Sequence, residues 1–193
     1  TGVQTCALPI SVCKDCGSSM ILGLTGYAQS GKDSVADILV KNHGYKRIAF
    51  ADKIKELLYE TDPFVKGDYH LRSLVNAYGW DIVKKNDEVR RMLQNMGMAA
   101  RKTFGEDFWV EQALSNLHSF ENYVVTDVRF TNEANKIKFI GGRLWRIKRP
   151  GVEPVNDHVS ESEMDGYKVD QIIVNRGTLQ ELEELVNERC LLN

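Results

Sequence analysis

Two glycines and a lysine give the clearest chemical signal in the sequence. Gly26 and Gly31 are separated by four residues, Lys32 follows directly, and the preceding run Met20–Leu24 is largely apolar. Glycines let a loop curl with its backbone N–H groups pointing inward, and a helix beginning at the lysine adds the positive end of its dipole. A strand, such a loop and a helix form a site for nucleoside triphosphates. The predicted cofactor-binding residues here are Gly26, Ala28, Ser30, Gly31, Lys32, Asp33 and Ser34.

The residue after the lysine departs from the usual pattern. Ser or Thr normally stands there and binds Mg²⁺ through its hydroxyl, whereas here Asp33 comes first and Ser34 follows. A carboxylate beside a triphosphate is repulsive unless a cation lies between them. Asp33 therefore either ligates Mg²⁺, directly or through water, or acts as a base toward the molecule that accepts a transferred phosphate, called the acceptor below. Asp33 and Ser34 are both candidate metal ligands, and Lys32 and Asp33 are candidate catalytic residues.

Charged residues also follow two other predicted strands. Asp127 ends the apolar run Asn122–Asp127, and Arg129 comes two residues later. An acidic residue in this place orients Mg²⁺ or its waters near a phosphate loop, so Asp127 and Arg129 are candidates for catalysis and for substrate contact. Asp52 follows the predicted strand Tyr45–Phe50, at the end where open parallel sheets bind ligands. Its alternative role is the N-cap of the next helix.

Apolar spacing predicts the elements that position these residues. Strands are predicted at Met20–Leu24, Tyr45–Phe50, Asn122–Asp127, Arg143–Lys148 and Gln171–Asn175. Helices are predicted at Lys32–His43, Lys53–Glu60, Leu71–Tyr78, Asp87–Thr103, Phe108–Leu117, Asn132–Ile140 and Thr178–Arg189, the last with Thr178 as its N-cap. A short helical turn is predicted at Trp80–Asn86, and the rest of 61–86 is irregular. The alternation predicts an α/β fold with a five-stranded parallel sheet and helices on both faces. Together with the phosphate loop and the insertion and lid described next, it predicts a three-layer P-loop kinase fold for phosphoryl transfer to a small acceptor.

Two regions interrupt this alternation. Residues 51–119 are predicted to form a helical insertion that holds the acceptor. Residues 149–168 contain two of the four prolines and many acidic residues, which is typical of a mobile segment or lid rather than a packed element. A lid of this kind closes over the phosphates and excludes water. Arg146 and Arg149, at its entrance, are predicted to contact transferring phosphates and are candidate catalytic residues.

Composition narrows the class of protein. The 193 residues are 42% hydrophobic and 27% charged, enough for one domain with a full core. A net charge of −2 favours neither a nucleic-acid nor a membrane surface, and no apolar run has membrane-spanning length. Four cysteines, three of them before residue 20, form no disulfide framework, so a cytoplasmic location is expected. A homodimer is compatible with the sequence.

Residues 1–19 do not read as part of this fold. The run TGVQTCALPI resembles the translation of a short-read sequencing adapter, so 1–19 is expected to be a non-native or disordered extension. Residues 20–193 are expected to form a single kinase domain.

The motifs of the chain, taken in order, resemble the phage deoxynucleoside monophosphate kinases. The resemblance is carried by GYAQSGKDS (26–34), FAD (50–52), RRMLQNMG (90–97), FGEDFWV (104–110), DVRFTNEA (127–134), GGRLWRIKRPG (141–151) and VNRGTL (174–179). An aspartate after the loop lysine is regular in that family. The resemblance implies transfer of the γ-phosphate of ATP to a deoxynucleoside monophosphate, in the host cytoplasm if the protein is phage-encoded.

The resemblance also implies roles for residues far from the loop. Asp52, Arg90 or Arg91, and Gln94 would face the acceptor nucleotide, and Asn175 and Gly177 would lie near the adenine of ATP. Kinases for dephospho-coenzyme A and phosphomevalonate share the fold and are alternatives, as is an ATP-binding protein without turnover. A GTPase switch is disfavoured, because no Asn-Lys-x-Asp guanine motif occurs.

Overall fold

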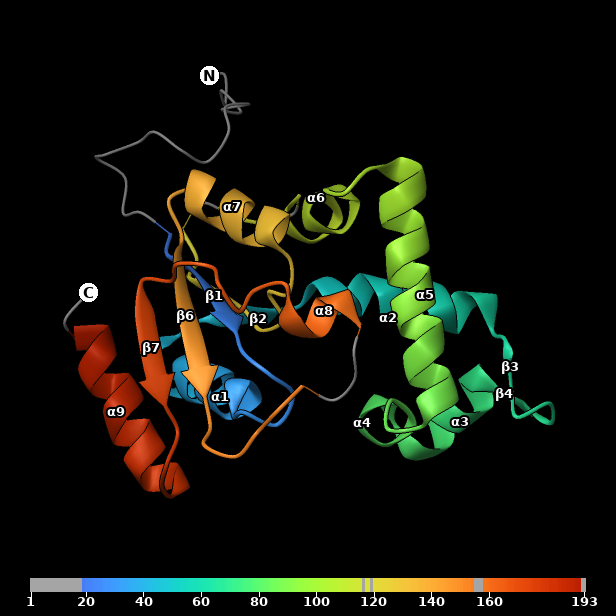
Figure 1. Cartoon of the computed structure of the whole chain (residues 1–193), viewed down its shortest axis with the longest axis horizontal. Helices are drawn as coiled ribbons and strands as arrows, with labels where there is room; N and C mark the ends of the chain where they lie inside the picture. The colour runs from blue at the N-terminus through green and yellow to red at the C-terminus, as the bar shows by residue number, and fades with distance from the viewer. Residues whose placement is uncertain (1–18, 116, 119, 155–157, 192–193) are drawn as a thin grey trace, which may run out of the picture. The chain divides into compact units, whose positions relative to one another are not determined.

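The computed structural model describes residues 19–115, 117–118, 120–154 and 158–191 (Figure 1). The described residues divide into two compact units, one that lies within 1–48 and 116–193 and the other within 49–115. The predicted insertion, 51–119, overlaps the second unit closely. The predicted extension lies outside the described residues except for Ser19, so its nature stays a prediction.

The first unit is built on a parallel sheet. Its described strands are β1 (Ile21–Thr25), β2 (Lys46–Ile48), β5 (Tyr123–Val125), β6 (Arg143–Lys148) and β7 (Gln171–Val174). They lie in the order β2-β5-β1-β6-β7, all parallel. The strand that precedes the glycine loop, β1, is therefore central, and the segments following β1, β5, β6 and β7 all leave from one edge of the sheet.

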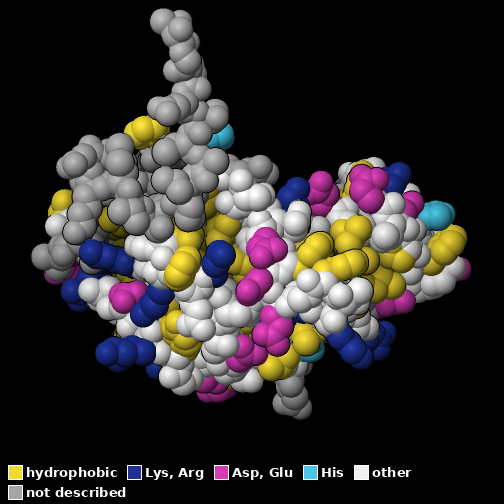
Figure 2. All heavy atoms as spheres, turned by 90° about the horizontal axis from the view of Figure 1, so that it is seen from above, with side chains coloured by type: hydrophobic (Ala, Val, Ile, Leu, Met, Phe, Trp, Pro, Cys, Tyr) yellow, Lys and Arg dark blue, Asp and Glu magenta, His cyan; other side chains and the backbone are white. Residues whose placement is uncertain are grey.

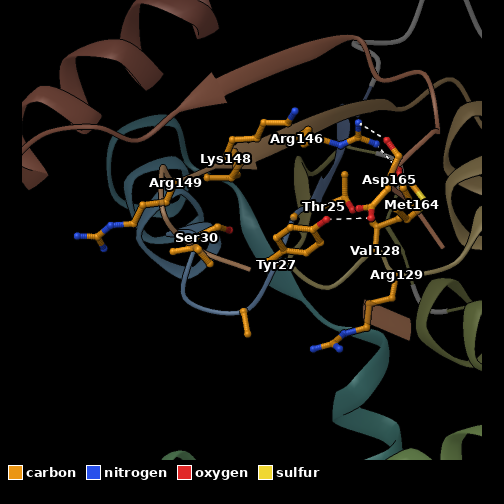
Figure 3. A pocket seen from close by; sticks show the side chains of 14 residues that line it. Thr25, Tyr27, Ser30, Val128, Arg129, Arg146, Lys148, Arg149, Met164 and Asp165 are labelled. Carbon is orange, nitrogen blue, oxygen red and sulfur yellow. Dashed lines mark hydrogen bonds between the residues drawn. The ribbon is translucent and has the colours of Figure 1, made fainter. Parts of the chain in front are cut away.

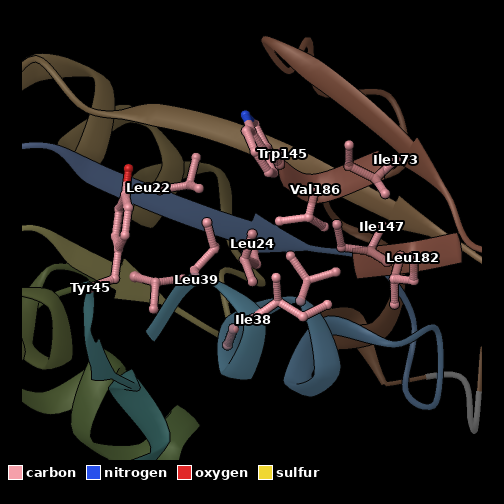
Figure 4. Packing of buried hydrophobic residues seen from close by; sticks show 13 residues of the cluster. Leu22, Leu24, Ile38, Leu39, Tyr45, Trp145, Ile147, Ile173, Leu182 and Val186 are labelled. Atoms are coloured by element: carbon pink, nitrogen blue, oxygen red, sulfur yellow. The ribbon is translucent and has the colours of Figure 1, made fainter. Parts of the chain in front are cut away.

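Helices cover both faces of this sheet because β1 is apolar on both sides. The first unit's described helices are α1 (Lys32–His43), α7 (Thr131–Phe139), α8 (Val159–Ser162) and α9 (Leu179–Leu191). Leu22 and Leu24 pack with residues of α1 and α9 in one buried cluster (Figure 4). On the other face, a Cβ built at Gly23 would lie 2.8 Å from Ile137 of α7. The predicted fold class, a five-stranded parallel sheet between two helical layers, is confirmed.

The second unit is mainly helical and has a core of its own. It contains α2 (Phe50–Thr61), a hairpin of β3 (Phe64–Val65) and β4 (Tyr69–His70), α3 (Leu71–Tyr78), α4 (Trp80–Val83), α5 (Asp87–Phe104) and α6 (Phe108–Leu114). Leu58, Val65, Leu71, Val83 and Val89 form its buried cluster. The long helix α5 begins after Asn86, whose side chain accepts from the backbone N–H of Glu88 at 2.9 Å, as an N-cap does.

Three predictions about local structure are wrong. Asp52 is not an N-cap, because α2 begins at Phe50 with Ala49 as its N-cap. The hairpin β3–β4 lies in a stretch that was predicted to be irregular. The second half of the predicted lid is packed, because α8 lies there and Met164 is only 6% exposed. By contrast, Thr178 caps α9 as predicted: its hydroxyl accepts from the N–H of Glu181 at 3.3 Å.

The charges of the surface are mixed. On the face drawn in Figure 2, Lys and Arg side chains are interspersed with Asp and Glu. Within the described part of the chain, no helix has the length and apolar character that crossing a membrane requires.

Candidate active site

The loop after β1 is shaped by a glycine that no other residue can replace without movement of the backbone. Gly26 has φ +134°, and a Cβ built there would lie 2.2 Å from the carbonyl oxygen of Ile147 in β6. Gly31, with φ +106°, is the N-cap of α1. Both positions favour glycine, by conformation and, at Gly26, by close approach of another backbone. The predicted order of strand, glycine loop (Gly26–Lys32) and helix is confirmed, and phosphate binding by this loop, called the phosphate loop below, stays a prediction.

Lys32 bonds to the backbone of the loop that precedes it. Its Nζ donates to the carbonyl oxygens of Gly26 and Tyr27, each at 2.7 Å. Ser30 is 1% exposed, and its Oγ has no hydrogen-bond partner among the described residues. A buried hydroxyl without a partner is costly, and it lies in the loop that the sequence assigns to phosphate. The ammonium of Lys32 and this hydroxyl fit a polyphosphate ligand.

A cavity of about 280 Å³ lies beside this loop (Figure 3). Its lining comes from the end of β1 and the loop, from the turn after β5, from β6 and from four residues of the predicted lid: Thr25, Gly26, Tyr27, Ala28, Ser30, Val128, Arg129, Arg146, Ile147, Lys148, Arg149, Val152, Met164 and Asp165. Four of these side chains are cationic. Of the predicted catalytic residues, Arg129, Arg146 and Arg149 therefore do line one cavity next to the phosphate loop.

The arginines nevertheless point in different directions. In Figure 3 the guanidinium groups of Arg129 and Arg149 point away from that of Arg146. Arg146 bonds to backbone carbonyl oxygens: Nη1 donates to Asp165 at 3.1 Å, and Nη2 donates to Tyr167 at 2.9 Å and to Met164. In this arrangement Arg146 holds the segment after α8, and Arg149 is exposed at the cavity wall.

Asp127 lies at the same edge of the sheet as the phosphate loop. The register pairs Gly23 with Val125, so Asp127, two residues later, lies at the level of Thr25. The backbone N–H groups of Arg129 and Phe130 donate to Oε2 of Glu133 at 2.7 and 3.0 Å. Glu133 is 4% exposed, and this buried carboxylate, which the sequence reading missed, fixes the turn that carries Arg129.

A tyrosine of the loop and an aspartate of the predicted lid meet at the cavity. The hydroxyl of Tyr27 donates to Oδ2 of Asp165 at 2.8 Å. This bond, with partial burial and the negative charges of Asp165 and Glu153, raises the pKa of Tyr27 above its usual value. The sequence reading assigned neither residue to the site, and 138 positions separate them, so no local spacing could have revealed the contact.

The predicted adenine contacts have structural roles in the described molecule. Asn175 is 8% exposed, and its Nδ2 donates to the carbonyl oxygen of Ser30 at 3.1 Å. Gly177 is exposed, and a Cβ there would lie 2.0 Å from the carboxylate of Glu181, which bonds to Thr178. Asn175 thus lies next to the phosphate loop, as a site residue would.

The residues predicted to hold Mg²⁺ lie in the first turn of α1. Asp33 is exposed and Ser34 is half-buried, directly after Lys32. Both offer the hard oxygen ligands that Mg²⁺ prefers. Among the described residues no group of three or more His, Cys, Asp or Glu side chains forms a metal site. The residues therefore fit a Mg²⁺ ion that takes most of its ligands from phosphates and water.

Four of the predicted acceptor contacts belong to the second unit, whereas Asp127 and Arg129 belong to the first. Asp52 accepts a hydrogen bond from Lys55 at 2.8 Å in the first turns of α2. Arg90 and Gln94 are four residues apart on α5, both half-buried, and therefore share one face of that helix. Arg91 is exposed, whereas Arg90 forms an ion pair with Asp87 at 3.7 Å.

Comparison with known proteins shows the family to which the chain belongs. The family model described as deoxynucleotide monophosphate kinase matches residues 73–186. A protein of Acanthamoeba polyphaga mimivirus that carries the same family name is 30% identical over 178 residues, covering 84% of this chain and 91% of that protein.

A phage enzyme and a solved structure are also similar. The deoxynucleotide monophosphate kinase of Enterobacteria phage T4 is 25% identical over 171 residues, 86% of this chain but only 58% of that enzyme. Dephospho-coenzyme A kinase from Campylobacter jejuni superposes with a TM-score of 0.44 at 17% identity, covering 90% of this chain and 96% of that chain. Because the family model spans more than half of its length, the chain belongs to the deoxynucleotide monophosphate kinase family.

Proposed function

We propose that this protein transfers the γ-phosphate of ATP to a deoxynucleoside monophosphate, giving ADP and a deoxynucleoside diphosphate. The observation that carries the proposal is the phosphate loop of a family member, with Lys32 on its carbonyl oxygens and a cationic cavity beside it. Phosphoryl transfer needs positioning and charge neutralisation more than covalent chemistry. Loop N–H groups and cations supply both.

Different residues of the first unit position the phosphates and neutralise their charge. Lys32 moves from the carbonyl oxygens of Gly26 and Tyr27 to the β- and γ-phosphates, because a charge-assisted bond to phosphate is stronger than one to a neutral carbonyl. Arg146, Arg149 and Arg129 offer positive charge from the cavity wall. When Mg²⁺ is bound it neutralises charge on the phosphate oxygens, and Asp33 or Ser34 would hold it, with Asp127 orienting its waters.

The second unit carries the acceptor in this proposal. Arg90 and Gln94 share one face of α5 and are half-buried, so their side chains have limited freedom to lose on binding. Of the two adjacent arginines, we assign the acceptor phosphate to Arg90, since Arg91 is exposed on a different face. Asp52 of α2 contributes an acceptor oxygen for the sugar or base.

A coupled assay of ADP release tests the proposal. ATP and Mg²⁺ are mixed with dAMP, dGMP, dCMP or dTMP, and in parallel with ribonucleotides, dephospho-coenzyme A and phosphomevalonate. Turnover that requires a deoxynucleotide is the expected result and names the base. Turnover only with a non-nucleotide acceptor would overturn the substrate assignment, and nucleotide binding with no turnover would leave an ATP-binding protein without kinase activity.

A further inference from the structure

The segment that contains α8 is held by three side chains from elsewhere in the first unit. This segment, Val159–Tyr167, is called the lid segment below. Oε1 of Glu163 accepts from the N–H and the hydroxyl of Thr131, at 2.9 and 3.0 Å, at the start of α7. The hydroxyl of Tyr167 donates to Asn135 of the same helix at 2.6 Å. Arg146 donates to three carbonyl oxygens of the segment.

A fourth contact joins the lid segment to the phosphate loop. The bond from the hydroxyl of Tyr27 to Asp165, at 2.8 Å, spans the cavity wall, and Figure 3 shows the ring of Tyr27 directed toward Asp165. The carbonyl oxygen of the same Tyr27 accepts from Lys32. Tyr27 therefore bonds both to the lid segment and to the lysine that is predicted to bind phosphate.

These contacts compete with a bound polyphosphate. Three of the five N–H donors of Arg146 are used on carbonyl oxygens of the lid segment. Two of the three donors of Lys32 are used on Gly26 and Tyr27. The carboxylate of Asp165 lines the same cavity, so phosphates placed there meet a negative charge at short range in a partly enclosed site. Phosphates that attract both cations remove the partners that hold the loop and the lid segment together.

We propose that Tyr27 and Asp165 form a latch that keeps the lid segment on the phosphate loop until a nucleoside triphosphate binds and releases it. The inference rests on the proposed function, because it takes the triphosphate to bind at Lys32 and Arg146. Tyr27 and Asp165 are positioning residues: they hold other groups and need not touch the reacting phosphate. Because coupling is reciprocal, a latch that nucleotide opens must also weaken nucleotide binding.

Two variants separate the hydrogen bond from the charge. Tyr27→Phe removes the bond and keeps the carboxylate, whereas Asp165→Asn removes the charge and keeps an oxygen that accepts from Tyr27. Tyr59→Phe is the matched control, because the hydroxyl of Tyr59 also makes an exposed bond of 2.8 Å, to Asn76, in the second unit. The full chain is used, with the non-hydrolysable analogue AMPPNP and Mg²⁺ as the probe.

Binding is measured by calorimetry, and the lid segment is followed by hydrogen exchange. Both latch variants are expected to bind AMPPNP about 3- to 10-fold more tightly than the wild type, the range expected for loss of one competing solvent-exposed hydrogen bond. Tyr59→Phe is expected to bind as the wild type does. In the wild type, AMPPNP is expected to speed exchange at the amides of Glu163, Asp165 and Tyr167; in Tyr27→Phe, exchange is already fast without it.

The opposite pattern would overturn the latch. If AMPPNP slows exchange in the lid segment and Tyr27→Phe weakens binding, the contact closes over nucleotide instead of yielding to it. If the variants bind as the wild type does, the contact is not coupled to nucleotide at all. If the wild type fails to bind AMPPNP, the nucleotide site itself is wrong and the release mechanism falls with it; the ADP-release assay then decides the proposed function separately.

Discussion

Asn175 lies so close to Gly31 that a Cβ on the glycine would come within 2.5 Å of the asparagine amide nitrogen. That amide donates to the carbonyl oxygen of Ser30 at 3.1 Å and is buried. The end of β7 therefore fixes the end of the phosphate loop, although the two lie at opposite ends of the chain. The backbone of Asn175 is itself bonded to Lys148 at 2.8 Å, so the support is anchored in the sheet.

Removal of that support is expected to destabilise the protein and loosen the loop. Asn175→Ala leaves the carbonyl oxygen of Ser30 without its buried donor, which costs about 1–3 kcal/mol. Urea unfolding measures the free energy of unfolding, and AMPPNP titration measures the nucleotide affinity of the loop. Asn76→Ala, which removes the exposed partner of Tyr59, is the control and is expected to stay within about 0.5 kcal/mol of the wild type. Equal stability of the two variants would contradict the assigned role.

Gly26 is expected to tolerate no side chain. In Gly26→Ala the new Cβ meets the carbonyl oxygen of Ile147 at 2.2 Å, so β1 or β6 must shift in addition to the strain of φ +134°. Gly105→Ala isolates the strain, because Gly105 has φ +110° and nothing within 4 Å of a built Cβ. We expect a loss of about 1–3 kcal/mol for Gly105→Ala from backbone strain and a clearly larger loss for Gly26→Ala. If the two variants unfold at similar temperatures, β6 must move away from the new Cβ at little cost in free energy.

The features that the sequence predicted correctly are those that local chemistry dictates. The phosphate loop is read from Gly26, Gly31 and Lys32 because the backbone there needs glycine, and the apolar strand before it is a run of buried residues. The fold class followed from alternation of such strands with amphipathic helices. Thr178 was predicted to be an N-cap because a hydroxyl directly before an amphipathic helix can accept from the free backbone N–H groups of the first turn.

The features that were missed depend on long-range contacts or on very short elements. The strands of the β3–β4 hairpin have two residues each, too few for an alternation to show. The composition of residues 149–168 indicated a lid, but no local pattern shows that Met164 is buried or that Asp165 meets Tyr27. Glu133 reads as one more helical surface charge, whereas its burial comes from capping the turn at Arg129.

Lys32→Ala is expected to abolish phosphoryl transfer while the protein stays folded. The Nζ of Lys32 donates to the carbonyl oxygens of Gly26 and Tyr27, and a single preorganised donor to a transition state is worth about 100- to 1,000-fold in kcat. Lys41→Ala, an exposed lysine in the last turn of the same helix, is the control. Circular dichroism checks the fold, and retained activity in Lys32→Ala would remove the lysine from the mechanism.

Arg149→Ala is expected to lower kcat much more than it raises the KM for ATP. The guanidinium is exposed and points away from Tyr27 in Figure 3, so it must swing inward to reach a transferring phosphate. An interaction made only in the transition state is lost from kcat and kcat/KM alike. Arg149→Lys, which keeps the charge, is expected to recover part of kcat. A proportionate rise in KM with unchanged kcat would show that Arg149 binds ground-state ATP.

Tyr45 links the stability of the first unit to alkaline pH. It is 7% exposed, and its hydroxyl donates to Sδ of Met20 at 2.9 Å, a weak acceptor. Burial, with a smaller contribution from the negative charge of the nearby Cys190 thiolate, raises the pKa of Tyr45 to about 12, against an opposing effect of Arg143. The unfolded chain keeps the usual value of 10.0.

Stability is therefore expected to fall as pH rises from 10 toward 12. Below pH 10 the phenol is protonated in both states, so its contribution is fully present; above pH 10 the unfolded chain releases the proton that the folded chain retains. The loss reaches at most about 2.7 kcal/mol, or 1.36 kcal/mol per pKa unit. In Tyr45→Phe the fall between pH 10 and 11.5, measured by urea unfolding, is expected to be smaller by this contribution. Tyr59→Phe, with its exposed hydroxyl, is the control; identical slopes in Tyr45→Phe and wild type would show that Tyr45 ionises as readily in the folded protein as in the unfolded chain.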